Sequence, residues 1–136
     1  MKRYLLDTNV ISELRKPKPH GGVKAWFDRL QSEQIYLSAV TMGELQAGVE
    51  RTRNQDADKA REIEGWIGDL PDTMFVLAMD LICFREWGRL MRDKPGTLTI
   101  DAMIASTAIV HGLAVATRNE RDFRNFAVEI YNPFRS

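Results

Sequence analysis

The chain has 136 residues, of which 44% are hydrophobic and 28% charged, and its 19 basic side chains balance its 19 acidic ones. This composition is typical of a folded globular protein and excludes a disordered chain, while zero net charge removes the simple argument for a basic nucleic-acid-binding protein. The single cysteine, Cys83, excludes an internal disulfide and a CxxC motif. Asp7 comes too early for a signal peptide, and no apolar run approaches the roughly 20 residues of a membrane span. We therefore expect a single cytoplasmic domain over residues 1–136.

Short apolar runs alternate with segments whose apolar residues recur at helical spacing. In chain order, the predicted elements are a strand over 4–6, a helix over 8–15, a loop over 16–22, a helix over 23–30, a strand over 35–37, helices over 41–53 and 56–70, a strand over 74–77, helices over 81–91 and 99–111, and strands over 113–116 and 128–131. Prolines and glycines keep 16–22 a loop, and Pro71 and Gly112 end the helices before them. The helices over 41–53 and 56–70 suggest a hairpin on the sheet. The pattern predicts a three-layer α/β/α domain with a mostly parallel central sheet of about five strands.

Polar side chains lie where this fold would bring them to one edge of the sheet. Asp7 directly follows the first strand, and Asn119 comes just after the fourth. Glu44 lies early in a helix, and Asp101 opens the most apolar helix of the chain. Since open parallel sheets bind ligands beyond the carboxyl ends of their strands, these side chains are candidate catalytic residues.

Several of these residues have a purely structural interpretation as well. Asp7 has the position of an N-cap for the helix that follows it. Thr41 and Glu44 have the spacing of a capping box, which would account for Glu44 without any function. For Asp101, with Thr99 as the expected cap, the helix dipole contributes about 0.3–1 kcal/mol. That is little against the cost of desolvating a carboxylate among apolar neighbours, so function is favoured for Asp101.

The acids together point to a metal. Two carboxylates about 4 Å apart repel each other by roughly 4 kcal/mol at an effective dielectric constant of 20, so a cluster needs protons or a cation. With oxygen ligands and no Cys/His cluster, the fitting cation is Mg²⁺ or Mn²⁺. The chemistry that follows is metal-assisted hydrolysis of a phosphodiester.

Four segments carry a family resemblance. They are LLDTNVISEL (5–14), SAVTMGELQAGVER (38–51), LTIDAMIASTA (98–108) and VATRNERDF (115–123). In this order and spacing the chain resembles the PIN-domain ribonucleases and, within them, the VapC-type toxins of bacterial toxin–antitoxin pairs, nearest to the FitB-like branch. The closing YNPF (131–134) fits the same branch. Each motif alone is weak, but together they cover nearly the whole chain.

The resemblance implies a role for each matching residue. Asp7, Glu44 and Asp101 match the first, second and third metal-binding acids of the family. Thr8 matches the hydroxyl that supports the site beside the first acid. Asn119 falls where many members carry a fourth acid, which removes one negative charge and leaves open whether a second metal binds.

The implied activity is hydrolysis of RNA by a metal-activated water, leaving a 5′-phosphate and a 3′-hydroxyl. Asp122, three residues after Asn119, is expected either to support the metal ligands or to cap a helix. Positive charge must flank an acidic site that binds RNA. The candidates are Arg15, Lys16, Lys18, Arg51, Arg53, Arg118, Arg121 and Arg124. Arg118 and Arg121 are favoured because they lie beside the last motif.

The resemblance also implies partners. Family members usually form homodimers and are inhibited by an antitoxin, here of the VapB or FitA type, whose tail covers the acidic cleft. Contact with DNA is expected only through that antitoxin, and no contact with a membrane is expected.

Two rival classes are weighed against this interpretation. Haloacid-dehalogenase-like phosphatases need a second acid two residues after the first, where this chain has Asn9, and no GxxxxGK[ST] loop occurs. The second rival is a non-catalytic subunit of the same fold that binds RNA or serves assembly. Cleavage of RNA that requires Mg²⁺ and stops with EDTA would separate an enzyme from such a subunit.

Overall fold

A computed structural model describes residues 1–135 and shows a five-stranded, entirely parallel sheet in the order β3-β2-β1-β4-β5. The strands are β1 (Tyr4–Leu6), β2 (Ile35–Ser38), β3 (Phe75–Leu77), β4 (Ala114–Ala116) and β5 (Ile130–Tyr131). The helices are α1 (Thr8–Arg15), α2 (Gly21–Asp28), α3 (Ala39–Arg53), α4 (Ala57–Thr73), α5 (Leu81–Leu90), α6 (Thr99–His111) and α7 (Glu120–Phe123). The predicted architecture of helices around a mostly parallel sheet is confirmed.

Apolar side chains on the two faces of the sheet build two cores. Tyr4 and Leu6 of β1 point into the core formed with α1 to α4, while Leu5 points into the core formed with α6. This alternation follows from the two-residue period of a strand, and burial on both faces explains why β1 is wholly apolar. Within the described residues, none of the helices combines the length and the apolar character that crossing a membrane requires.

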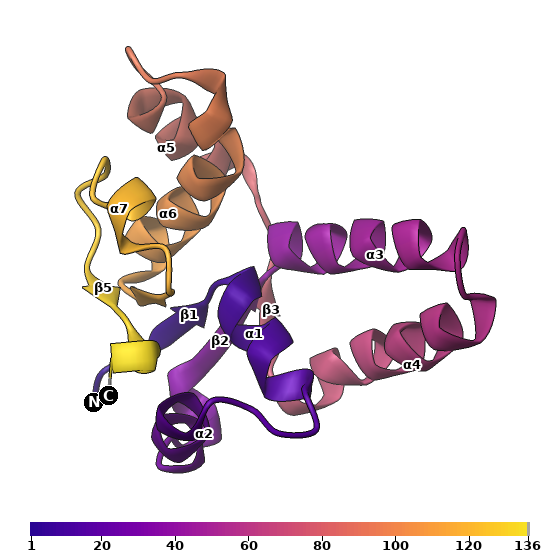
Figure 1. Ribbon diagram of the computed structural model, residues 1–136. Helices are drawn as coiled ribbons and strands as arrows, with labels where there is room; N and C mark the ends of the chain where they lie inside the picture. Colours follow the sequence, from indigo (N-terminus) through magenta and orange to yellow (C-terminus); the bar gives the residue numbers. More distant parts are fainter. Residues whose placement is uncertain (136) are drawn as a thin grey trace.

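Helices α3 and α4 form the expected hairpin, but they do not lie flat on the sheet. The pair extends sideways from it, with α1 beside its base (Figure 1). A pocket of about 270 Å³ is lined by residues of α1, α3 and α4. The helices α5 and α6 pack together on the other side of the molecule (Figure 1).

Some boundaries differ from the sequence-based expectation. Helix α2 begins at Gly21, inside the predicted loop, because Nδ1 of His20 accepts hydrogen bonds from the backbone N–H groups of Gly22 and Val23. The predicted end of α4 at Pro71 is also wrong. The N–H of Met74 donates to the carbonyl of Leu70, so the helix continues past a proline whose missing N–H disrupts only its last turn.

Gly112 ends α6 as predicted, with φ of 68° in the left-handed region. We expect Gly112→Ala to lower the free energy of unfolding by about 1 kcal/mol, because a Cβ is disfavoured at this φ. The matched control is Gly65→Ala in the exposed middle of α4, where an added Cβ meets nothing within 4 Å. That change should instead stabilise by about 0.5–1 kcal/mol. Urea denaturation of both variants checks the opposite signs.

Candidate active site

The order of the strands places a crevice beside Asp7. From β1 the chain builds β2 and β3 on one side of the sheet, and β4 and β5 lie on the other. The connections therefore diverge where β1 and β4 lie next to each other, and such a switch point is where parallel α/β sheets bind ligands. Leu6 pairs with Ala116 at this edge, so the next residues, Asp7 and Thr117, meet at the carboxyl ends of the two strands.

Asp7 is buried, with 5% of its surface exposed, and its carboxylate accepts three hydrogen bonds. Oδ1 accepts from the N–H of Thr8 at 2.8 Å, so Asp7 is the N-cap of α1. Oδ2 accepts from the Thr117 hydroxyl at 2.8 Å and from the Asn9 amide at 3.2 Å. Burial is the main cause that raises the pKa of Asp7; the hydrogen bonds oppose it and nearby Glu44 adds to it. The capping and functional interpretations of Asp7 are therefore compatible.

Glu44 is not part of a capping box, which corrects the prediction from sequence. Helix α3 starts at Ala39, and its cap is the Ser38 hydroxyl, which accepts from the N–H of Val40 at 3.0 Å. Thr41 is fully buried inside the helix. The Glu44 carboxylate instead accepts a hydrogen bond from the Thr8 hydroxyl at 2.7 Å. Thr8, the residue after Asp7, thus holds the Glu44 carboxylate on the Asp7 side of the site.

Asp101 lies in the first turn of α6, and its pKa is raised to about 6. Burial is the largest cause, followed by the negative charges of Asp7, Asp122 and Glu44. The predicted cap Thr99 is wrong: its hydroxyl donates to the carbonyl of Gly96, and no side chain caps this helix. Asp101 is therefore an acid whose ionised form is destabilised by the other acids of the site, as the sequence-based argument for function requires.

Asp122 brings the fourth carboxylate to the site. Asn119 stands before α7 without capping it, and its side-chain amide donates to Oδ2 of Asp122 at 2.8 Å. The Asp122 charge is the second-largest carboxylate influence on Asp101, after that of Asp7. The charge that Asn119 lacks is thus supplied one turn later, and Asn119 orients the residue that supplies it.

Two residues of the site were not identified from the sequence. The fully buried Thr117 donates to Asp7 and accepts from the N–H of Asn119 at 2.9 Å. Asn9 donates to Asp7, and its Oδ1 accepts from the N–H of Arg118 at 3.1 Å. A signal for Thr117 existed, because it directly follows a buried strand as Asp7 does. Asn9 gave no such signal, since its partners Thr117 and Arg118 lie far away in the chain.

The donor chemistry of the site fits a hard divalent cation, because the four acids offer only carboxylate oxygens. Their geometry is not that of an assembled ligand set. Within residues 1–135, no group of three or more His, Cys, Asp or Glu side chains is arranged to hold a metal ion. Hydrogen bonds explain part of this: Asp7 is bound by Thr8, Thr117 and Asn9, and Glu44 by Thr8. The structure therefore brings the charges into mutual range without forming a coordination sphere.

The basic residues predicted to contact RNA differ in whether they form ion pairs within the protein. Arg118 lies 4.0 Å from the nearly buried Glu13 carboxylate and places its guanidinium 3.9 Å from the centre of the Phe134 ring. Lys16 pairs with the same Glu13, and Arg124 pairs with Glu120. Other predicted RNA contacts keep their charge available: within residues 1–135, no ion pair involves Arg15, Lys18, Arg51 or Arg121.

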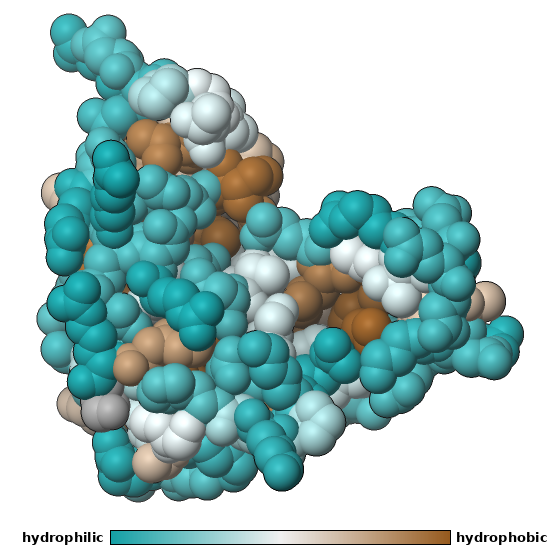
Figure 2. Space-filling model, viewed as in Figure 1, coloured by the Kyte–Doolittle hydropathy of each residue, from teal (hydrophilic) through white to brown (hydrophobic). Residues whose placement is uncertain are grey.

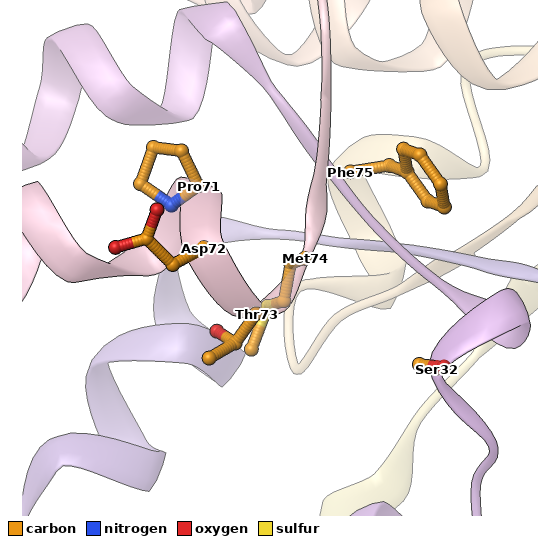
Figure 3. Close-up of a pocket in the computed structure, with 6 residues that line it drawn as sticks. All are labelled: Ser32, Pro71, Asp72, Thr73, Met74 and Phe75. Carbon is orange, nitrogen blue, oxygen red and sulfur yellow. The ribbon is translucent and has the colours of Figure 1, made fainter.

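A small pocket elsewhere is not a candidate active site. It has a volume of about 160 Å³ and lies where α4 ends and β3 begins, lined by Ser32, Pro71, Asp72, Thr73, Met74 and Phe75 (Figure 3). Ser32 precedes β2 and Phe75 starts β3, so this pocket is at the amino ends of parallel strands. Ligands of such sheets bind at the opposite edge, where Asp7 lies.

Comparison with known proteins agrees with this geometry. Residues 4–129 match the PIN domain family. The chain is 36% identical to the VapC ribonuclease Y4jK of Sinorhizobium fredii, covering 96% of each chain. It is 33% identical to the toxin FitB of Neisseria gonorrhoeae, covering 96% of this chain and 97% of FitB. A chain in the crystal structure of FitAcB from the same organism superposes with a TM-score of 0.83 at 33% identity, covering 98% of this chain and 99% of that one.

The raised pKa of Asp101 has a consequence for stability. A carboxyl whose pKa rises on folding stabilises the folded protein below its unfolded pKa of 3.8, and that contribution disappears as the pH rises through about 6. In EDTA at pH 8, we expect Asp101→Asn to be more stable than the wild type by about 1–2 kcal/mol, about half the full value because the group is partly exposed. At pH 4 the two should be similar, as urea denaturation would measure.

Asp93→Asn is the control for this experiment, because the Asp93 side chain is 91% exposed and Asn tolerates its left-handed backbone. It should show no comparable gain at pH 8. An Asp101→Asn variant that is less stable than the wild type at pH 8 would contradict the electrostatic account of the site.

Proposed function

The chain belongs to the PIN-domain family, and on that premise we propose that it is the ribonuclease toxin of a type II toxin–antitoxin pair. In this proposal, residues 1–136 form a single PIN domain that hydrolyses RNA phosphodiester bonds with Mg²⁺, for which Mn²⁺ substitutes. RNA as substrate and one unpaired, buried Cys83 favour action in the cytoplasm. The names of the two toxin relatives, with nearly complete mutual coverage, support the assignment.

The observation that carries the proposal is that the other acids of the site destabilise the ionised form of Asp101. Asp7, Glu44 and Asp122 all raise the pKa of Asp101, to which burial contributes most. Burying the ionised Asp101 beside three other acids costs stability that the helix dipole offsets by only about 0.3–1 kcal/mol, so folding alone does not account for this arrangement. A divalent cation would relieve the repulsion and favour the ionised forms of Asp7 and Asp101.

Asp7, Glu44, Asp101 and Asp122 are the residues proposed to hold the metal. When bound, Mg²⁺ supplies a water of lowered pKa and neutralises charge on the phosphodiester. Hydrogen bonds from the surrounding residues orient three of these acids. Thr8 donates to Glu44, Thr117 and Asn9 donate to Asp7, and Asn119 donates to Asp122. The proton that Asp101 holds near pH 6 must leave before this carboxylate can bind a cation, so metal binding should weaken in acid.

Arg118 and Arg121 are the proposed RNA contacts on the β4–α7 side of the site. The backbone of Arg118 is fixed by Asn9, and its side chain remains 60% exposed despite the contacts with Glu13 and Phe134. Arg121 is exposed on α7. Arg118 precedes Asn119 and Arg121 precedes Asp122 in the chain, so both place positive charge on the segment that carries these polar residues, where the phosphates of an RNA strand would otherwise be repelled.

The surface supports the proposed protein partners. An apolar groove of about 470 Å³ runs between α1, α2 and α4, with Leu14, Phe27 and Trp66 among its lining residues. We assign it to the helix of a VapB- or FitA-like antitoxin, through which alone the complex would contact DNA. Leu81 and Ile82 are more than half exposed on α5, which supports burial of that helix in a homodimer.

The alternative, a non-catalytic RNA-binding or assembly subunit of the same fold, keeps one observation in its favour: the acids are not arranged as a finished metal site among the described residues. The electrostatic influence of Asp7, Glu44 and Asp122 on Asp101 favours the enzyme.

Removing a single carboxylate tests the proposed activity. Asp7→Asn and Asp101→Asn should each lower Mg²⁺-dependent RNA cleavage by at least about 100-fold, since each removes a charged metal ligand, while circular dichroism shows the native fold. EDTA should abolish wild-type cleavage, and sequencing should find 5′-phosphate ends. Wild-type levels of cleavage in both variants would dismiss the proposed site.

Neutralising the α7 side tests the RNA contacts. The double change Arg118→Gln and Arg121→Gln should weaken binding of single-stranded RNA in EDTA and reduce the salt slope of log K by about 0.7 for each phosphate that the protein no longer neutralises. The control is Arg92→Gln, at a side chain 88% exposed after α5. An unchanged salt slope in the double variant would remove this surface from the RNA path.

A further inference from the structure

We propose that the pocket between α1, α3 and α4 binds the RNA strand beside the cleaved bond, with Arg15 and Arg51 holding a neighbouring phosphodiester. This inference rests on the proposed nuclease function and adds a second group of phosphate contacts to its substrate site, besides Arg118 and Arg121. It depends on the shape of the pocket and on unpaired charge, and on neither the raised pKa values nor the metal.

The pocket is continuous with the acidic site. Thr8 and Glu44 line it, and they are joined to each other by the 2.7 Å hydrogen bond. Its volume of about 270 Å³ is near the lower limit of ligand pockets, which suits one nucleotide and not a folded partner. Figure 2 shows apolar atoms in a hollow between α3 and α4, with hydrophilic residues around it. An occupant would therefore extend directly from the candidate catalytic carboxylates.

The charges of the lining favour an anion. Arg15 and Arg51 contribute two positive charges and Glu44 one negative charge, which leaves one positive charge in excess. Neither arginine forms an ion pair within residues 1–135, although Lys16 and Arg53 near them do. Arg53, two residues further along α3, is bound by both Glu50 and Glu64. Arg51 forms no ion pair within the described residues, so its charge is available to a ligand.

The aromatic wall explains how Arg15 is held without an acid. Its guanidinium lies 5.9 Å from the centre of the Trp66 ring, within the range of a cation–π contact. This contact favours a position of the guanidinium over the ring, and no hydrogen bond to another residue among 1–135 engages its donors, which leaves them free for a phosphate. Leu45, Val49 and Ile63 form the apolar part of the lining, which suits the sugar or base of the same nucleotide.

Gly48 keeps the pocket open on the α3 side. It lines the pocket, and a Cβ added there would meet only the end of the Arg51 side chain, at 3.7 Å. A larger side chain at this position would therefore fill the space without disturbing the backbone. Gly65 of α4 offers a matched position outside the pocket, since an added Cβ there meets nothing within 4 Å.

The test measures binding of a fluorescein-labelled, single-stranded RNA oligonucleotide by anisotropy, in EDTA so that binding is separated from cleavage. Arg15→Gln and Arg51→Gln should each weaken binding about 3- to 10-fold and lower the salt slope of log K by about 0.7. Arg53→Gln should change neither quantity, because that arginine is already paired with protein acids.

Filling the pocket is the second arm of the same experiment. Gly48→Leu should weaken RNA binding, whereas Gly65→Leu should bind as the wild type does. Both changes replace a helical glycine with a better helix former, so thermal denaturation should show folded protein in each case. Weaker binding with retained stability assigns the effect to the pocket.

The inference is overturned if Arg15→Gln, Arg51→Gln and Gly48→Leu all bind RNA like the wild type, or if Arg53→Gln loses as much affinity as Arg51→Gln. Wild-type cleavage of RNA in Mg²⁺ is scored separately. If the wild type cleaves RNA but all three variants bind RNA normally, the pocket is not part of the RNA site and the nuclease assignment stands. The pocket would then be assigned to a protein ligand. Weaker binding in a protein that never cleaves RNA would support the pocket and overturn the proposed function.

Discussion

The buried carboxylate of Asp7 is the feature on which the site depends. It lies between the ends of β1 and β4, where it accepts bonds from Thr8, Asn9 and Thr117. A charged group in that position is costly unless it is well bonded, and these three donors come from both sides of the crevice. The same contacts tie helix α1 to the segment after β4. The hydrogen bonds that hold the Asp7 carboxylate therefore also hold the ends of β1 and β4 together.

Around this carboxylate the protein gathers more negative charge than its fold needs. Glu44 arrives on α3, Asp101 on α6 and Asp122 on α7, so the acids come from helices on both faces of the sheet. The cost is visible in the raised pKa of Asp101. Stability given up in this way is characteristic of functional sites, which keep groups in states that folding alone would not select.

Acidic partners within the protein, as well as position, determine which basic side chains are available to bind RNA. Glu13 engages Lys16 and approaches Arg118, and Glu50 and Glu64 engage Arg53. Among the predicted RNA contacts without an ion pair in residues 1–135, Arg15 and Arg51 line the pocket beside Glu44, and Arg121 lies on the α7 side, next to Asp122 in the chain. Positive charge on two sides is expected for a site where a strand of RNA must approach carboxylates. The hairpin of α3 and α4 extends from the sheet and so provides one of these sides (Figure 1).

The sequence by itself determined the alternation of strands and helices, the bounds of α1 and α6, and the candidates Asp7, Glu44 and Asp101. These follow from local patterns: apolar periodicity, the stop at Gly112, and acids next to apolar runs. Only the tertiary structure decided that Ser38 caps α3, which frees Glu44. It also decided that Asp122 supplies the fourth charge, and that Asn9 and Thr117 bind Asp7. Each of these depends on where distant parts of the chain meet, or on which of several nearby polar side chains forms a given hydrogen bond. Neither is encoded in local spacing.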